Sequence, residues 1–313
     1  MTGSKAAWKI LWRGAGLVTL NVVLAFVIMR VNDARHDYAS WKTDSVLLAM
    51  PHDREFHVLV MGASHAQFLS RYKAHHEVLE SEWGGPVANI ALPTGGGLVP
   101  NYLMMQTFYE RGNRADVLLY VLDPFVFFAD QVNGSHPFVY NEPFQFGFFI
   151  KALRAGVPPK RLFIYIQSKF CYDWFFKKPE PLPWRKDFLT EANLDDVARM
   201  DRRRATLYPE GMDSSRFEKY AETFRSIVDL AQAHGTRIIC VIPPSLLGPE
   251  QGADKVCGSL DALQARSKLR YYDWSNELTD PRYFFDYDHL NLDGVRQFAE
   301  LLRPVLARVD KGD

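Results

Sequence analysis

The sequence has little of what marks several large functional classes of protein. It contains three cysteines, Cys171, Cys240 and Cys257, and no C-x-x-C pair, so neither a zinc knuckle nor a dense disulfide framework can be read from it. One bridge between Cys240 and Cys257 stays open for an oxidising compartment. Lysine plus arginine and aspartate plus glutamate number 37 each, so no net charge draws the chain to nucleic acid.

Long apolar runs are missing too, apart from one near the N-terminus. Residues 14–29 carry no charge, with three basic residues before them and Arg30 directly after. At ~1.5 Å per residue the run covers about 24 Å, and Trp12 with snorkelling arginines can extend it toward the ~30 Å hydrocarbon core. We interpret residues 1–31 as a membrane anchor with a cytoplasmic N-terminus, because positive charge precedes the run.

A cleaved signal peptide and a buried helix of a soluble protein are the competing interpretations of this run. The sequence across the end of the run, VIMRVNDARHD, offers no small-x-small cleavage site. An uncleaved anchor predicts a single-pass protein of the cell inner membrane. The remainder would then be periplasmic, joined to the anchor by a polar stalk at residues 32–55.

After the stalk, short apolar strands alternate with helical patterns. Strands are expected at His57–Met61, Val87–Ala91, Asp116–Asp123 and within 236–244, and helices at 66–83, 101–111, 215–235 and 291–309. Such alternation is typical of βαβ units with a parallel sheet. We therefore predict an α/β fold over residues 56–313, a three-layer α/β/α sandwich with a mainly parallel sheet.

An aromatic-rich stretch at residues 125–215 interrupts this alternation. It contains FVFF, FQFGFF and YDWFFKKPEPLPW, none of which is long enough to cross a bilayer. We interpret the stretch as an insert. It is either a small cap with its own core or a surface that touches a membrane, a partner or a polymer substrate.

The stretch FHVLVMGASHAQFL places Ser64 directly after the first strand and a small-residue turn. The carboxyl ends of parallel strands are where open α/β sheets place their sites. A serine there is suited to acyl transfer. Serine is also a common helix N-cap, which is the competing interpretation of Ser64.

The segment FFDYDHLNLDG near the other end of the chain places Asp286 three residues before His289. A hydroxyl nucleophile needs a base to take its proton, and the base needs an acceptor that fixes its tautomer. The two residues supply both parts. Alternatively, Asp286 or Asp288 caps the next helix and His289 is solvated.

Together these pieces resemble the SGNH (GDSL-like) hydrolase superfamily. The resemblance rests on Gly62-Ala63-Ser64, on NIALPTGGG and on DYDHLNLDG, and it covers residues 56–123 and 217–309. It is closest to membrane-anchored, extracytoplasmic members that add acyl groups to polysaccharides or remove them. The resemblance implies Ser64 as nucleophile, His289 as general base and Asp286 as its orienting carboxylate.

The resemblance also implies an oxyanion hole made by the backbone N–H groups of Ser64 and of Gly95 or Gly96. Two positions depart from the family pattern. Gly-Asp-Ser is Gly-Ala-Ser here, and the third-block asparagine has no counterpart, because the strand ends in Asp123. A carboxylate cannot donate to an oxyanion, so another donor such as His65 or Asn89 would be needed.

The sequence thus predicts an anchored serine esterase or O-acyltransferase that modifies an envelope or secreted polysaccharide, with an integral membrane acyltransferase as a partner that the resemblance suggests. No cofactor and no metal are expected. One alternative is a non-catalytic glycan-binding or assembly subunit, and another is a metal-dependent hydrolase that uses His65, Asp286 or Asp288, and His289. His75 and His76 are expected on a solvated helix face. The run from Arg202 to Arg204 is expected in a solvated turn, although an acidic polymer could use it.

Overall fold

The structure is a computed structural model. It describes residues 3–35, 47–70, 73–92, 96–170, 201–202, 205–208, 211–246 and 248–310. Much of the predicted stalk and most of the C-terminal third of the insert lie outside the described residues.

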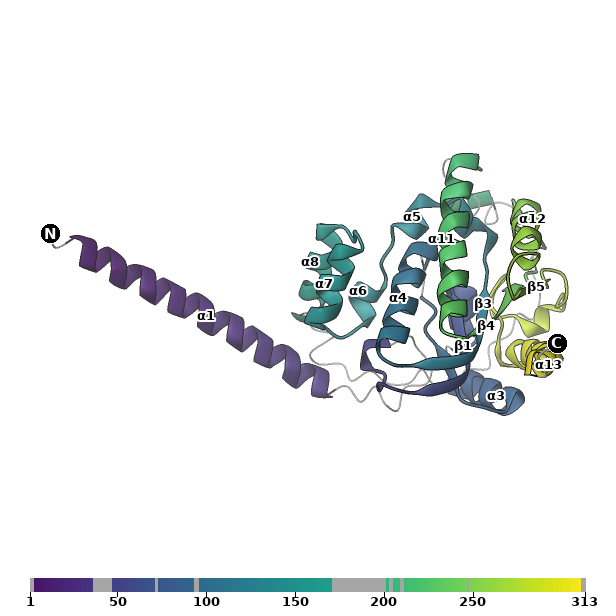
Figure 1. Cartoon of the computed structure of the whole chain (residues 1–313), viewed down its shortest axis with the longest axis horizontal. Helices are drawn as coiled ribbons and strands as arrows, with labels where there is room; N and C mark the ends of the chain where they lie inside the picture. The colour runs from purple at the N-terminus through teal and green to yellow at the C-terminus, as the bar shows by residue number, and fades with distance from the viewer. Residues whose placement is uncertain are drawn as a thin grey trace.

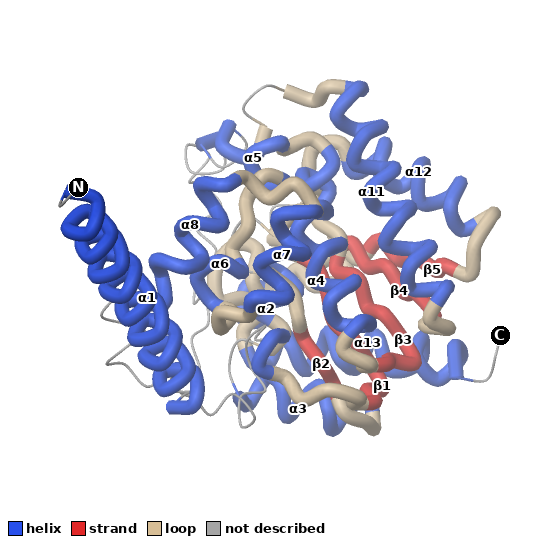
Figure 2. The backbone as a smooth tube through the Cα atoms, turned by 60° about the vertical axis from the view of Figure 1, so that its left-hand side comes forward, coloured by secondary structure: helices blue, strands red, loops and turns tan. Residues whose placement is uncertain are grey.

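Five parallel strands form one sheet in the order β2-β1-β3-β4-β5, shown as red tubes in Figure 2. Their bounds are β1 Glu55–Gly62, β2 Val87–Asn89, β3 Arg114–Val121, β4 Arg237–Ile242 and β5 Leu269–Asp273. Every neighbouring pair is parallel. The predicted α/β fold class is confirmed.

Helices cover both faces of the sheet (Figure 1). One face packs against α4 Leu98–Glu110, α11 Ser214–Ala233 and α12 Ala253–Gln264, and the other against α2 Ser64–Phe68, α3 Lys73–Trp83 and α13 Leu292–Asp310. The central strands are apolar without interruption because both of their faces are buried. In β1, Leu59 and Met61 enter the first of these cores, and Val58 and Val60 enter the second.

The insert folds as short helices against the first of these faces. They are η3 Pro124–Phe127, α5 Asp130–Asn133, α6 Phe138–Asn141, α7 Phe146–Arg154, α8 Pro159–Gln167 and η4 Ser168–Phe170. Phe138, Phe148 and Tyr165 pack edge to face with ring centroids 5.1–6.2 Å apart, so the insert has an aromatic core. That core is continuous with the core beneath α4 and α11.

Helix α1 Gly3–Arg35 stands apart from the sheet, and its stretch Ala7–Val31 is long and apolar enough to cross a membrane. The folded part of the chain begins earlier than the expected Phe56. Leu47 and Leu48, in the short helix η2 Leu47–Ala49, are buried although they fall within the predicted stalk. Two adjacent leucines have enough apolar surface to join the core.

Several predicted elements differ in detail. The single helix expected over 66–83 is two helices, α2 and α3, while β5 and α12 were not expected at all. Strand β5 is an edge strand with partly exposed side chains, so it lacks the unbroken apolar run of the central strands. Cys240 and Cys257 are free thiols, so the bridge considered for them is not formed.

Candidate active site

The turn between β1 and α2 depends on Gly62. Its φ is +143°, and a Cβ atom there would lie 2.3 Å from the Val121 carbonyl oxygen and 2.9 Å from the Ala66 Cβ. Only glycine tolerates this backbone conformation and this close approach. The turn therefore brings α2 directly over the ends of β1 and β3, with Ser64 as its first residue.

Ser64 does not cap α2. The N-cap position belongs to Ala63, and no side chain caps the helix. The Ser64 side chain is half-buried at the carboxyl edge of the sheet. This position disagrees with the interpretation of Ser64 as a helix cap and leaves its hydroxyl available for another role.

Asp286 and His289 form a tight local pair. The His289 ring Nδ1 lies 2.8 Å from Asp286 Oδ2, and the backbone N–H of His289 donates to Asp286 Oδ1 at 2.8 Å. The Asp288 N–H donates to the same oxygen at 3.0 Å. Burial alone would raise the pKa of Asp286. The hydrogen bonds and charge of His289, together with the charge of His65, outweigh burial and hold this pKa below its ordinary value of 3.8. Asp286 is thus an ionised acceptor that orients the imidazole.

The His289 ring packs against α2. It stacks on the Phe68 ring with centroids 4.0 Å apart and on the His65 ring with centroids 5.0 Å apart. Both partners belong to the short helix that Ser64 begins. The structure therefore brings the Asp286–His289 pair and Ser64 to the same edge of the sheet, from opposite ends of the chain.

The loop that carries this pair is braced by the residues that follow it. Asn291 donates from its side chain to the carbonyl oxygens of Arg282 and Phe284 and accepts from the Gly294 N–H. At Gly294 a Cβ would lie 2.0 Å from the Tyr283 carbonyl oxygen, so the close approach requires glycine. The Asn-x-x-Gly part of the segment thus shapes the loop rather than taking part in chemistry.

A second histidine–carboxylate pair lies beside Ser64. His65 Nδ1 is 2.5 Å from Asp123 Oδ1, and the side chains are 5% and 1% exposed. Gly62 is in register with Val121, so the residues two positions later, Ser64 and Asp123, leave the sheet at the same level. The pairing was not predicted, although adjacent parallel strands at a common edge are the signal for it.

The other residues considered as hydrogen-bond donors to an oxyanion are Gly95, Gly96 and Asn89. Gly95 lies outside the described residues, while the carbonyl of Gly96 accepts a hydrogen bond from Asn101 Nδ2 at 2.9 Å. Asn101, which the sequence did not single out, also donates to the Gly62 carbonyl at 3.2 Å and so ties the glycine turn to the end of β1. Asn89 donates to the Ala66 carbonyl and accepts from the Ala91 N–H, so its amide holds α2 in place.

His75 and His76 are not on a solvated face, and that prediction is wrong. Their exposed fractions are 1% and 2%. His75 Nδ1 lies 2.9 Å from the Phe68 carbonyl oxygen, and His76 Nδ1 lies 3.3 Å from Ser70 Oγ. Both rings therefore secure the junction between α2 and α3. Arg202 is exposed, as expected for a solvated turn, but it lies in a short helical segment, and Arg203 and Arg204 lie outside the described residues.

Asp286, Asp288 and His289 have potential ligand atoms within 4.8 Å of one another, the geometry of a candidate metal site. In this arrangement Asp286 already accepts from His289, and Asp288 Oδ1 lies 3.4 Å from Ser245 Oγ. His65 is not a member of this group. The cluster keeps the metal-dependent alternative open to a direct test.

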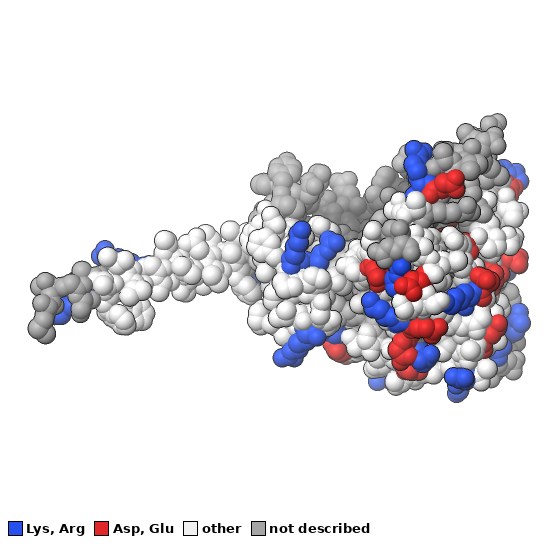
Figure 3. All heavy atoms as spheres, turned by 90° about the horizontal axis from the view of Figure 1, so that it is seen from above, with Lys and Arg blue, Asp and Glu red and all other residues white. Residues whose placement is uncertain are grey.

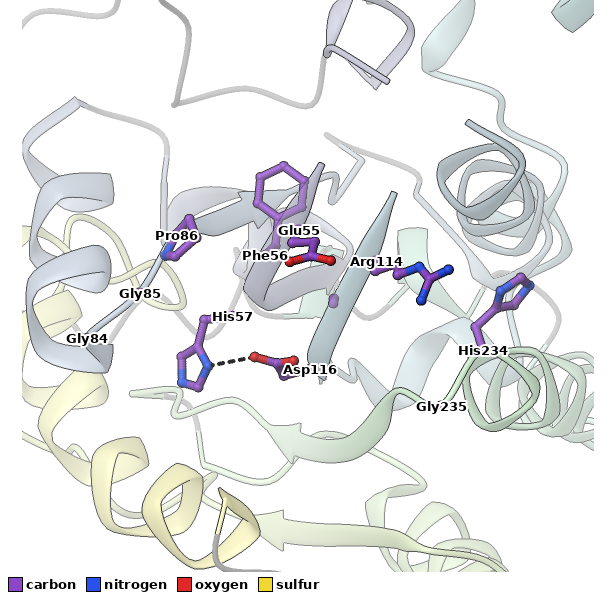
Figure 4. Close-up of a pocket in the computed structure, with 11 residues that line it drawn as sticks. Glu55, Phe56, His57, Gly84, Gly85, Pro86, Arg114, Asp116, His234 and Gly235 are labelled. Carbon is purple, nitrogen blue, oxygen red and sulfur yellow. Dashed lines mark hydrogen bonds and ion pairs between the residues drawn. The ribbon is translucent and has the colours of Figure 1, made fainter. Parts of the chain in front are cut away.

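A polar cleft of about 630 Å³ lies at the opposite end of the sheet, where β1 and β3 begin (Figure 4). Its side chains include Glu55, Arg114 and His234, and His57 Nδ1 lies 3.2 Å from Asp116 Oδ2. No residue that lines it has a hydroxyl or thiol that could act as a nucleophile. The cleft is therefore a poorer candidate for covalent catalysis than the Ser64 edge.

Comparisons with known proteins give similarity in structure but no match in sequence. No family model and no curated protein match it. Among solved structures, it is similar to the crystal structure of a putative acylhydrolase from Bacteroides fragilis NCTC 9343, at 11% identity and a TM-score of 0.41, covering 82% of this chain and 88% of that one. This similarity is too low to transfer the activity of that protein.

Proposed function

We propose that the chain is a membrane-anchored, SGNH-like serine esterase or O-acyltransferase. The observation that carries the proposal is the position of the Asp286–His289 pair, whose ring stacks on the helix that Ser64 begins. A nucleophile, a base and an orienting carboxylate are then supplied at one edge of the sheet.

In the proposed reaction, Ser64 Oγ attacks the carbonyl carbon of an acyl ester while His289 takes the hydroxyl proton. Asp286 orients His289 and stabilises the imidazolium that forms. The proton then passes to the leaving alcohol oxygen, which produces an acyl-serine. Attack by water on this intermediate gives hydrolysis, and attack by a sugar hydroxyl gives transfer.

His65 takes the place of the missing asparagine in this proposal. Asp123 cannot donate to an oxyanion itself, but a carboxylate in contact with an imidazole orients the ring and stabilises positive charge on it. A charged His65 next to the nucleophile would stabilise the negative oxygen of the tetrahedral intermediate. The backbone N–H groups of Ser64 and of Gly95 or Gly96 would contribute as well.

The candidate membrane span in α1 supports the proposal that the protein is attached to a membrane. We propose that the span anchors the chain in the cell inner membrane and that the α/β domain is periplasmic. The substrate would be an envelope or secreted polysaccharide, and an integral membrane acyltransferase would supply acyl groups if the reaction is transfer.

The test is covalent trapping. Full-length protein in detergent is treated with a fluorophosphonate probe, digested and analysed by mass spectrometry, and the expected adduct maps to Ser64. Ser64→Ala should lose the adduct, while Ser70→Ala, six residues on in the same region, should keep it. Two other results together would instead support a non-catalytic glycan-binding or assembly subunit. The probe would not label the wild-type protein, and the Ser64→Ala variant would still perform the cellular function.

The group formed by Asp286, Asp288 and His289 specifically favours a second candidate, a metal-dependent hydrolase. This candidate predicts that ester hydrolysis is lost in chelator and returns with added zinc. The serine mechanism predicts that chelator leaves both hydrolysis and probe labelling unchanged.

A further inference from the structure

Helix α7 in the insert has two apolar faces. Phe148 and Ala152 are buried in the aromatic core. Phe146, Ile150 and Leu153 recur at spacings of four and three residues, so they share the other face. The exposed fractions of Phe146 and Leu153 are 67% and 47%. An amphipathic helix needs only one apolar face to join a core, so the second is available for another contact.

Neighbouring elements also carry exposed apolar side chains. Helix α8 contacts α7 and presents Phe163, which is 63% exposed. Tyr140 in α6 and Phe170 in η4 are exposed as well. Exposed aromatic side chains in such number are typical of interaction surfaces.

The same segment carries charge of one sign. Residues 143–170 contain five lysines and arginines and no aspartate or glutamate, in a chain whose opposite charges are equal in number. Arg154 and Lys160 are exposed, and Lys169 is buried. In Figure 3 the part of the domain nearest α1 shows mainly basic side chains, whereas acidic and basic side chains are mixed at the other end.

Hydrogen bonds attach this segment to the point where the chain enters the domain. The backbone N–H groups of Leu47 and Leu48 donate to the two carboxylate oxygens of Glu142 at 2.9 and 2.8 Å. Gln145 Nε2 donates to the Leu48 carbonyl at 2.6 Å. Gln145 directly precedes α7 and Glu142 directly follows α6, so the start of α7 lies beside the first described residues after α1.

The length of the connecting chain limits how far α7 can lie from α1. Helix α1 ends at Arg35, and residues 36–46 connect it to Leu47. Fully extended, this connection spans at most ~40 Å. Figure 1 places α7 and α8 on the side of the domain nearest α1, and Figure 2 shows α8 next to α1.

We propose that the exposed face of α7 and α8 rests on the anionic surface of the membrane that α1 spans. Phe146, Leu153 and Phe163 would enter the interfacial region, and Arg154 and Lys160 would meet lipid phosphates. The inference rests on the membrane anchoring in the proposed function and is independent of the serine chemistry. A second attachment point of this kind would restrict the rotation of the domain about its tether.

The test uses full-length protein in liposomes of phosphatidylcholine and phosphatidylglycerol, with a nitroxide on one introduced cysteine. The background carries Cys171→Ser and Cys257→Ser and retains the buried Cys240. Labels are placed by Phe146→Cys and Phe163→Cys, with Leu17→Cys in α1 as the bilayer control and Glu218→Cys on α11 as the aqueous control. Collision rates with oxygen, which concentrates in lipid, and with a water-soluble nickel chelate are compared by electron paramagnetic resonance.

The expected result is a several-fold higher oxygen-to-nickel ratio at positions 146 and 163 than at 218, and a lower ratio when Arg154→Glu and Lys160→Glu are introduced. Ratios at 146 and 163 equal to that at 218, with a high ratio at 17, would overturn the inference and leave the anchor intact. A low ratio at 17 as well would overturn the anchor itself. A high ratio at 146 and 163 in native membranes but not in pure liposomes would identify a protein partner and overturn the lipid contact.

Discussion

His65 Nδ1 and Asp123 Oδ1 lie 2.5 Å apart, between two strand ends that are in register in the sheet. The two side chains are nearly inaccessible to solvent, and the His65 ring stacks on the ring of His289. The Asp123 carboxylate cannot donate a hydrogen bond to an oxyanion, but it contacts His65, whose imidazole can. This pair offers a physical account of how the proposed site would stabilise an oxyanion although β3 is followed by Asp123 and not by an asparagine.

Asp123→Asn should lower kcat for hydrolysis of a p-nitrophenyl ester, because the amide stabilises positive charge on His65 less well. Loss of one oxyanion donor typically costs ~100- to 1,000-fold, and KM should change little. The matched control is Asp116→Asn, which removes the partner of His57 at the other end of the same strand. Equal effects of the two substitutions, or an effect on KM alone, would contradict the role of Asp123.

Ser64→Ala and His289→Ala should each reduce hydrolysis by ~10⁴-fold or more, and the double variant should be little worse than either single one. The members of a triad act as a unit, so their losses do not multiply. Asp286→Asn should retain about 10- to 100-fold more activity, because it alters the orientation and charge of the base without removing it. Steady-state kinetics of the four variants measure this directly, and multiplicative losses would show that Ser64 and His289 act separately.

Gly62→Ala should destabilise the domain by roughly 2–4 kcal/mol, because its φ of +143° and the nearby Val121 carbonyl leave no room for a Cβ. Gly258→Ala is the control. Gly258 lies inside α12, and a Cβ added there would have no heavy atom within 4 Å, so alanine should be neutral or stabilise by about 0.5–1 kcal/mol. Thermal unfolding of both variants in detergent gives the comparison, and a neutral Gly62→Ala would mean that the turn relaxes.

Glu142 should make stability depend on pH. Burial raises its pKa to about 7, although the Leu48 and Leu47 N–H groups and the charges of Lys169 and Arg111 favour the carboxylate. Between about pH 4.5 and 7 the folded state keeps the Glu142 proton, whereas the unfolded state releases it near the ordinary pKa of 4.5. The contribution of Glu142 to the free energy of unfolding therefore falls as pH rises through this range.

The measurement is the difference in free energy of unfolding between wild type and Glu142→Gln across this pH range. The difference should decline with rising pH by up to about 3 kcal/mol, since each pKa unit corresponds to ~1.4 kcal/mol. Lys160→Gln, an exposed change of one charge in α8, should leave the pH profile close to that of wild type. If the difference in free energy of unfolding between wild type and Glu142→Gln did not change with pH, Glu142 would not be the group responsible for the pH dependence.

Local patterns in the chain were sufficient for much of the fold. The apolar strands, the helical periodicity of α11 and the small-residue turn before Ser64 depend on neighbouring residues, so they could be predicted without knowing the rest of the molecule. The same holds for Asp286 and His289, whose hydrogen bonds span three residues. Edge strand β5 was missed because its side chains do not form an apolar run.

Contacts between distant segments could not be read in this way. The pairing of His65 with Asp123 follows from the register of β1 and β3, and the stacking of His289 on Phe68 follows from how the last loop packs on α2. The burial of His75 and His76 likewise depends on neighbours that no helical pattern reveals. Composition and spacing show which chemical groups a residue offers. Its burial and its partners depend on which surfaces meet when the sheet is assembled, because the contacts between those surfaces join residues far apart in the chain.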